Sequence, residues 1–144
     1  MSTQAIKAKV SLDLDAGPRA VFAAWVDPSL MERWLFKSPT NALEARSEPR
    51  PGGAFSIVEH EGSEVITHDG HYTICEAPTR LSFTLAVPRH FAGLAQIDVT
   101  ITPSGSGSHL DFRATGAGPS DAQQLWEKMI AKLAQQFGRE SPAG

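Results

Sequence analysis

Three side chains that can carry protons fall on two neighbouring apolar runs of the chain. They are the carboxylate Glu59, the imidazole His68 and the phenol Tyr72. Strict alternation of residues along a strand puts Glu59 on the same face as Ile57, and it puts His68 on the same face as Tyr72. The pattern therefore predicts that all three meet on one apolar surface.

A mostly hydrophobic chamber with a few oriented polar groups is typical of a small-molecule site, and a buried carboxylate beside an imidazole can also exchange protons with a substrate. A second interpretation remains open. The residues between Glu59 and Glu64 are typical of a turn, and alternation fails at strand ends. In that case Glu59 and His68 are solvated residues at the rim of a sheet.

The five histidines do not predict a metal site. His60, His68 and His71 lie within twelve residues, but no pair has the helical spacing of a zinc motif. The odd spacing of His68 and His71 directs them to opposite faces of a strand. We expect His90 and His109 to be exposed to solvent.

Nucleophilic chemistry has little support in the sequence. Cys75 lies on the parity opposite Ile74 and is interpreted as an inert thiol. Gly105-Ser106-Gly107 is typical of a loop between strands and lacks the strand-to-helix context of a nucleophile elbow. The stretch Arg50-Pro51-Gly52-Gly53 indicates a turn that needs glycine at positive φ. We assign no catalytic residue, no metal and no cofactor.

Composition narrows the partners and the location. The chain has 144 residues, 13 basic and 16 acidic side chains, and a formal charge of -3, so it lacks the basic excess that binds nucleic acid or an anionic membrane. One cysteine and the absence of an apolar leader indicate a cytoplasmic protein. We expect a single domain over residues 1–138 and a frayed tail over 139–144.

Hydrophobic periodicity divides the chain into an α+β order of one strand, two short helices, six strands and a long helix. Ser120 and Gln123 have the spacing of a capping box that starts a final helix of about 18 residues, and Gly138 is a natural stop. The short helices start at Pro18 and at Pro28. The expected strands cover residues 6–14, 43–47, 54–60, 65–76, 80–87, 94–102 and 109–115.

A set of short motifs accompanies this order of elements. They are Val21, Phe22, Trp25, Asp27-Pro28, Arg33-Trp34, Arg50-Pro51-Gly52-Gly53 before Phe55, Gly70, Pro78 and Arg80-Leu81. The order and the motifs together resemble the helix-grip superfamily of lipid-transfer (START-like, or SRPBCC) domains, and within it the branch similar to the activator of the heat-shock protein 90 ATPase. The resemblance covers about Ile6 to Phe137. One departure is Leu35, where many relatives carry a second tryptophan.

The resemblance implies a curved seven-stranded antiparallel sheet wrapped around the long C-terminal helix, with a cavity between them. It also implies an entrance near the two short helices, where Trp34 lies, whereas we expect Trp25 to pack in the core. We predict that the cavity binds a small, mainly hydrophobic molecule. The predicted ligand-binding residues are Trp34, Phe55, Ile57, Glu59, His68, Tyr72, Phe83, Trp126 and Met129.

Two alternatives remain. The protein is a chaperone accessory or another protein-binding module if its core is filled and a basic patch meets an acidic partner; the candidate residues are Lys7, Lys9, Arg46 and Arg50. It is a cyclase- or dehydratase-like enzyme if Glu59 and His68 converge within about 3 Å of a substrate atom.

Overall fold

A single antiparallel sheet of seven strands organises the protein, in the order β1-β7-β6-β5-β4-β3-β2. The computed structural model describes residues 4–137. Consecutive hairpins build the sheet from β2 to β7, and β1 then pairs with β7. The strands are β1 (Gln4–Leu14), β2 (Ala42–Ser47), β3 (Ala54–Glu61), β4 (Glu64–Glu76), β5 (Arg80–Leu85), β6 (Ala95–Ser104) and β7 (Gly107–Gly118).

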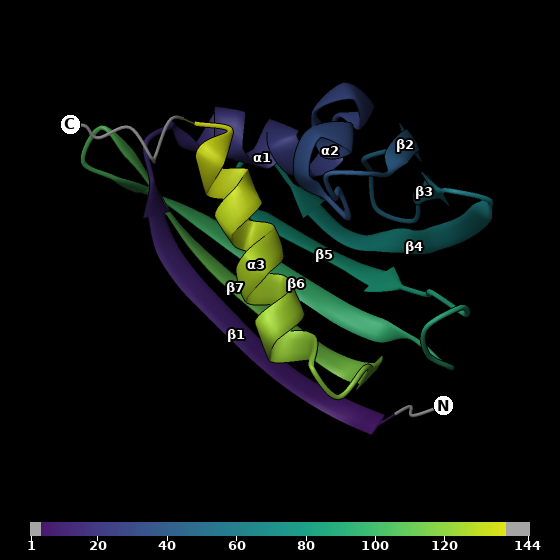
Figure 1. The fold of residues 1–144 in the computed structure, drawn as a ribbon. Helices are drawn as coiled ribbons and strands as arrows, with labels where there is room; N and C mark the ends of the chain where they lie inside the picture. Colours follow the sequence, from purple (N-terminus) through teal and green to yellow (C-terminus); the bar gives the residue numbers. More distant parts are fainter. Residues whose placement is uncertain (1–3, 138–144) are drawn as a thin grey trace.

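Three helices complete the fold: α1 (Pro18–Val26), α2 (Pro28–Trp34) and α3 (Ala122–Gln135). The sheet curves around α3, which crosses its concave face, and α1 and α2 lie together beside one end of α3 (Figure 1). The predicted α+β helix-grip architecture and its element order are confirmed. None of the helices within residues 4–137 has the length and apolar character needed to cross a membrane.

Asp27 separates the two short helices. It ends α1 in an extended conformation and begins α2, where its side chain accepts a hydrogen bond from the Ser29 amide at 3.0 Å. Pro18 and Pro28 each occupy a first turn, where no amide donor is needed. The buried Trp25 of α1 and Trp34 of α2 pack edge to face, with their ring centres 4.7 Å apart. This contact packs the two short helices against each other.

The predicted capping box at the start of the long helix is wrong. Asp121 occupies the N-cap position without a side-chain hydrogen bond, and the 14-residue helix is about 21 Å long, shorter than expected. The Gln123 side chain instead pairs with both backbone groups of Lys9 at 2.9 Å, on the free edge of β1. The first turn of α3 is therefore bonded to the edge strand β1 and has no side-chain N-cap. Gly138 and residues 139–144 lie outside the described residues.

The glycine turn before β3 has the predicted structural role. Gly52 has a φ of 84°, and the Gly52 amide donates to the Tyr72 carbonyl at 2.7 Å. A Cβ on Gly53 would lie 2.0 Å from the Glu48 carbonyl oxygen, so the turn has no room for a side chain there. Backbone geometry therefore explains both glycines.

The expected basic patch does not form as one surface. Lys7 and Lys9 lie on β1, whereas Arg46 lies on β2 and Arg50 follows it. Because β1 and β2 are the two opposite edges of the sheet, the four cations fall into two separate pairs. Sequence periodicity located each strand but contained no information on which strands end up at the edges.

Candidate functional site

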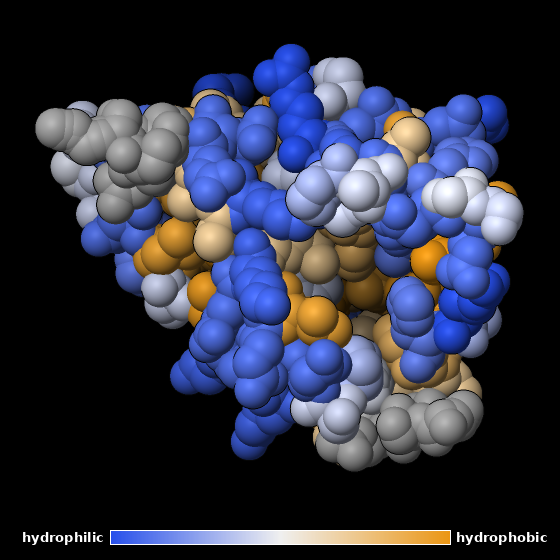
Figure 2. Space-filling model, in the orientation of Figure 1, coloured by the Kyte–Doolittle hydropathy of each residue, from blue (hydrophilic) through white to orange (hydrophobic). Residues whose placement is uncertain are grey.

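A pocket of about 440 Å³ opens between the first half of α3 and the strands that face it. Figure 2 shows a hollow on this side of the molecule, with apolar side chains at its bottom and polar ones around it. The apolar lining residues come from α3, β5 and three loops: Phe36, Leu85, Val87, Phe91, Pro119, Leu125, Trp126 and Met129. The polar lining residues are Glu59, His68, His90 and Asp121.

Glu59 and His68 form a buried pair at the polar end of this pocket. In the β3–β4 register, Ile57 lies opposite His68 and Glu59 lies opposite Ile66, so Glu59 and His68 are diagonal neighbours on one face. Glu59 Oε1 lies 3.0 Å from His68 Nε2, and the two side chains are 15% and 4% exposed. The alternative in which both are solvated rim residues is therefore wrong.

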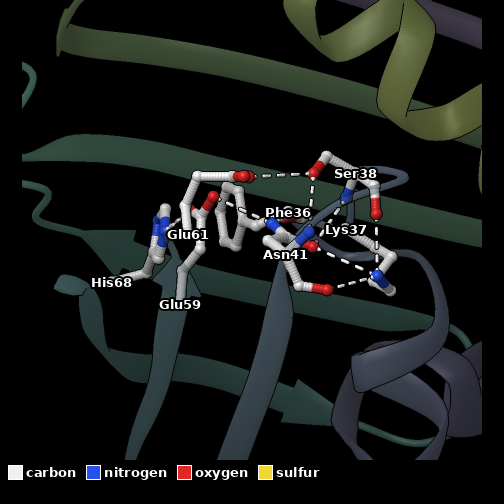
Figure 3. A network of polar contacts seen from close by, with 7 residues as sticks. All are labelled: Phe36, Lys37, Ser38, Asn41, Glu59, Glu61 and His68. Atoms are coloured by element: carbon white, nitrogen blue, oxygen red, sulfur yellow. Dashed lines mark hydrogen bonds and ion pairs between the residues drawn. The ribbon is translucent and has the colours of Figure 1, made fainter. Parts of the chain in front are cut away.

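Asn41 holds the second oxygen of Glu59. Its Nδ2 donates to Glu59 Oε2 at 2.8 Å and to the Phe36 carbonyl at 2.9 Å, while its Oδ1 accepts from the Ser38 amide at 2.9 Å (Figure 3). A backbone amide can only donate and a carbonyl can only accept, so these contacts fix the orientation of the Asn41 amide. Glu59 Oε2 is consequently an acceptor.

Several hydrogen bonds hold the loop that contains Asn41 in place. Lys37 Nζ donates to the Ser38 and Asn41 carbonyls at 2.7 and 2.6 Å, so the Lys37 side chain closes the loop on itself. The Thr40 hydroxyl donates to Glu61 on β3 at 2.7 Å. Lys132 on α3 donates to the Lys37 carbonyl. These contacts tie the loop to both the sheet and the long helix. Figure 3 shows the Lys37 contacts and a further contact from Ser38 to Glu61.

Phe36 covers one face of the His68 ring. The two rings are nearly parallel, with centres 3.9 Å apart and an angle of 14° between their planes, and Phe36 also meets Trp126 edge to face at 6.0 Å. Phe36 has a φ of 64°, a conformation that costs a residue other than glycine of order 1–3 kcal/mol. This backbone conformation accompanies the stacking of the Phe36 ring on the imidazole.

The other nitrogen of His68 has no partner within the described part of the chain. Nδ1 is buried and makes no hydrogen bond, a situation that typically costs about 1–3 kcal/mol. Burial lowers the pKa of His68 below its ordinary value, although the hydrogen bond to Glu59 acts in the opposite direction. Of the two ring nitrogens of His68, Nε2 thus contacts Glu59 and Nδ1 has no partner among the described residues.

The structure brings four of the nine predicted ligand-binding residues to the pocket: Glu59, His68, Trp126 and Met129. Trp34 lies elsewhere. Its side chain is fully buried, and its indole Nε1 donates to the Ala24 carbonyl at 2.9 Å. The indole thus links α2 to α1, and Trp34 does not line the pocket.

The other four predicted residues lie in the core beneath the pocket. Phe55, Tyr72 and Phe83 form an aromatic cluster with ring centres 5.1 to 6.2 Å apart, and Ile57 is fully buried. Burial raises the pKa of Tyr72 well above its usual range. Alternation correctly predicted that these four side chains are buried, but none of them lines the pocket.

Several pocket residues were not expected from the sequence. Val87 lies beyond the end of β5, where its carbonyl accepts hydrogen bonds from His90 and Phe91 in a tight turn. That turn brings Phe91 to the pocket and His90 to its rim, although His90 is exposed as expected. The apolar parity of Leu85 and Val87 was a usable signal, whereas nothing in the sequence marked Phe36 or Asn41.

Titratable groups outside this pocket do not form a second cluster among the described residues. No cluster of three or more His, Cys, Asp or Glu side chains that could hold a metal occurs within residues 4–137. His60 pairs with Glu44 at 3.5 Å, away from His68. His109 pairs with Asp13 at 2.9 Å, and this hydrogen bond raises the pKa of His109. Cys75 is half-buried, and burial raises the pKa of its thiol.

Comparison with known proteins places this architecture in a family. The sequence pattern described as "Activator of Hsp90 ATPase homolog 1-like protein" matches residues 15–138. The fold and this match define a helix-grip domain of the START-like type, and the chain belongs to the family of activator of Hsp90 ATPase homolog 1-like proteins. No curated protein matches the sequence.

Solved structures share the fold at low sequence identity. The AHSA1-like protein from Aeromonas hydrophila is 24% identical, with a TM-score of 0.78, and the alignment covers 96% of this chain and 99% of that one. Protein CV1439 from Chromobacterium violaceum is 19% identical, with a TM-score of 0.80 and coverage of 94% and 99%. An uncharacterized protein from Rhizobium leguminosarum is 19% identical, with a TM-score of 0.80 and coverage of 96% and 98%.

Proposed function

We propose that this protein binds a small, mainly apolar molecule in the pocket between α3 and the sheet. The observation that carries the proposal is the pocket itself, about 440 Å³ in volume, with an apolar wall and the Glu59–His68 pair at one end. Ligand sites typically have volumes of about 300–1,000 Å³ and a few oriented polar groups in an apolar lining. Trp126 and Phe36 offer aromatic surface to a flat ligand.

The pocket favours ligand binding over a chaperone-accessory role. A protein-binding module needs no apolar chamber, and its expected basic patch is divided between β1 and β2 at opposite sheet edges. The name of the family refers to activation of a chaperone ATPase, so binding to such a partner is the rival outcome. That outcome requires a salt-sensitive complex whose affinity changes with Lys9 or Arg46 and not with the pocket residues.

The binding experiment compares an apolar probe, 2-naphthol, on the wild-type protein and two variants by isothermal titration calorimetry. Met129→Glu places a charge in the pocket wall, whereas the control Val65→Glu changes an exposed apolar residue outside the pocket. We expect saturable one-site binding with a negative heat-capacity change in the wild type and in Val65→Glu, and its loss in Met129→Glu. Absence of binding to the wild type, or equal binding to Met129→Glu, overturns the proposal.

A proton-transfer enzyme is the second candidate, because Glu59 lies 3.0 Å from His68 at the pocket wall. In that reaction Glu59 orients the imidazole and His68 accepts a proton from the bound molecule. Chromatography of candidate ligands after incubation separates the two functions. Recovery of unchanged ligand supports binding, while conversion that stops in His68→Gln supports the enzyme.

Composition supports two further expectations. The 13 basic and 16 acidic residues favour neither nucleic acid nor an anionic membrane as a partner. We also infer a cytoplasmic location from the single cysteine, because secreted domains of this size commonly use paired cysteines. Fractionation of the native cells tests the location directly.

A further inference from the structure

We propose that the pocket selects apolar molecules that carry an ammonium group, such as arylalkylamines, over neutral and anionic molecules of similar shape. The proposal rests on the proposed function and specifies the charge of its ligand. Three features of the lining support it: two carboxylates, the lack of a lysine or arginine, and several aromatic rings.

The charged groups of the lining are mainly acidic. Glu59 and Asp121 line the pocket, and none of its lining residues within the described chain is a lysine or an arginine. Burial lowers the pKa of His68 below its ordinary value of 6.5, so this imidazole does not offset the carboxylates at pH 7.5. The remaining titratable residue of the lining is His90. Two carboxylates against one imidazole leave the lining negative whatever the charge of His90.

The cations on neighbouring segments are engaged with other groups. Lys37 Nζ donates to two carbonyls of its own loop at 2.7 and 2.6 Å, and Lys132 donates to the Lys37 carbonyl. Arg89, which precedes His90, pairs with Glu64 at 3.0 Å. Among residues 4–137, no lysine or arginine forms an ion pair with either carboxylate of the pocket. A positively charged ligand would therefore supply the missing counter-charge.

Asp121 is accessible to such a ligand. It is exposed at the N-cap of α3, and its side chain makes no capping hydrogen bond. The N-terminus of a helix acts as about half a positive charge, which the full negative charge of Asp121 outweighs. Charges attract over about 8–10 Å at moderate salt, so an ammonium group at the pocket gains from Asp121 even without direct contact.

Aromatic rings favour the same ligand. Phe36, Phe91 and Trp126 line the pocket. The face of an aromatic ring attracts a cation within about 6 Å of its centre, and tryptophan does so most strongly. The same rings pack against a flat apolar body. A molecule with an aromatic body and an ammonium group on a short arm therefore uses both the apolar and the charged parts of the lining.

The experiment uses three naphthalenes that differ in charge at pH 7.5: 2-naphthylmethylamine is a cation, 2-naphthol is neutral and 2-naphthoate is an anion. Affinities are measured by isothermal titration calorimetry at low salt. We expect the amine to bind about 3-fold more tightly than 2-naphthol and about 10-fold more tightly than 2-naphthoate, as partly hydrated ion pairs allow. Salt at about 0.5 M should reduce the tenfold ratio by about half or more.

Asp121→Asn is the matched variant, because it removes the charge, keeps the shape and leaves a preferred N-cap residue. We expect the ratio of amine to naphthoate affinity to fall to about 3-fold or less, with 2-naphthol affinity unchanged. Glu127→Gln is the control. It removes the same charge from an exposed position on α3 that does not line the pocket, so the ratio should stay within about twofold of the wild type.

The possible failures are distinguishable. If none of the three naphthalenes binds, the proposed function fails, and the selection by charge fails with it. If 2-naphthol binds and the amine binds no more tightly than 2-naphthoate, the pocket takes apolar ligands without this selection, and the present inference alone is overturned. An unchanged ratio in Asp121→Asn, or an equal fall in Glu127→Gln, also overturns it, because the preference then does not come from the pocket lining.

Discussion

The carboxylate of Glu59 and the imidazole of His68 meet from diagonal positions on β3 and β4, with 3.0 Å between Oε1 and Nε2. Both strands direct every second side chain to the concave face, so the register alone places the pair beside the pocket. Burying a polar group without a hydrogen-bond partner is costly. Asn41 provides such a partner for the second oxygen of Glu59, at 2.8 Å.

The stability of the protein should depend on the protonation of His68. Burial holds its folded pKa below the ordinary value of 6.5, with the neighbouring His90 acting in the same direction and Glu59 and Asp69 opposing. Between the folded pKa and 6.5, the unfolded chain binds more protons than the folded one. The free energy of unfolding should therefore rise with pH through this window. The contribution of His68 to that free energy is lost as the pH falls through the folded pKa. Urea unfolding at about pH 5.5 and pH 7.5 measures the change.

His68→Gln is the control for that titration. His109, whose pKa is raised by Asp13 and whose contribution has the opposite sign, is present in both proteins. The difference between wild type and variant therefore isolates His68. An identical pH dependence in the two proteins would contradict the depressed pKa.

Two adjacent residues of α3 should separate binding from stability. Met129 lines the pocket and is half-buried, whereas Ile130 is fully buried in the core and does not line the pocket. Ile130→Ala should cost about 2–5 kcal/mol of unfolding free energy, with 2-naphthol affinity unchanged in the folded protein. Met129→Ala should cost less stability and weaken binding several-fold. Parallel urea unfolding and calorimetry test both variants, and the reverse assignment of effects would contradict the position of the pocket.

Asn41 should act as a positioning residue for the polar pair. Asn41→Ala removes the donor to Glu59 Oε2 and the acceptor of the Ser38 amide, so we expect a loss of about 1–3 kcal/mol in the free energy of unfolding. The His68 pKa should change with it, because Glu59 is no longer held. Thr40→Ala is the control, since it removes only exposed hydrogen bonds of the hydroxyl, to Glu61 and to Ser38, and should cost at most about 0.5 kcal/mol. Equal losses in the two variants would show that Asn41 has no special role.

Gly70 should tolerate no side chain. A Cβ at this position would lie 1.9 Å from the Thr84 carbonyl oxygen and 2.5 Å from the Phe55 ring. Gly70→Ala must therefore move either the adjacent strand or a core aromatic ring, and we expect a loss of about 1–3 kcal/mol or more. Gly17→Ser is the comparison, because the N-cap of α1 has open space and serine is a preferred cap. Thermal unfolding of both variants measures the contrast.

The fold was predictable because its signals are local. Alternating residues marked the strands, Pro18 and Pro28 marked the short helices, and the apolar stripe of α3 marked the covering helix. The same alternation placed Glu59 and His68 on the inner face. Periodicity could not predict the cap of α3, because the Gln123 side chain binds the distant Lys9 backbone.

The extent of the pocket was less predictable, because it depends on packing between distant segments. Inward parity is shared by core residues such as Phe83 and by pocket residues such as His68, and only the path of α3 separates them. Phe36 reaches the site through a positive φ that its residue type does not signal. The family resemblance implied that Trp34 lies near an entrance. Its indole N–H instead donates to the Ala24 carbonyl of α1.

The central claim is that an apolar ligand occupies the space beside Met129. The most direct test is a methyl NMR titration of the methionines with 2-naphthol, since Met129 lines the pocket while Met31 is buried in the core away from it. We predict a saturable shift of the Met129 methyl resonance and a stationary Met31 resonance. A Met129 resonance that does not move at saturating 2-naphthol, or one that moves together with Met31, would contradict the claim.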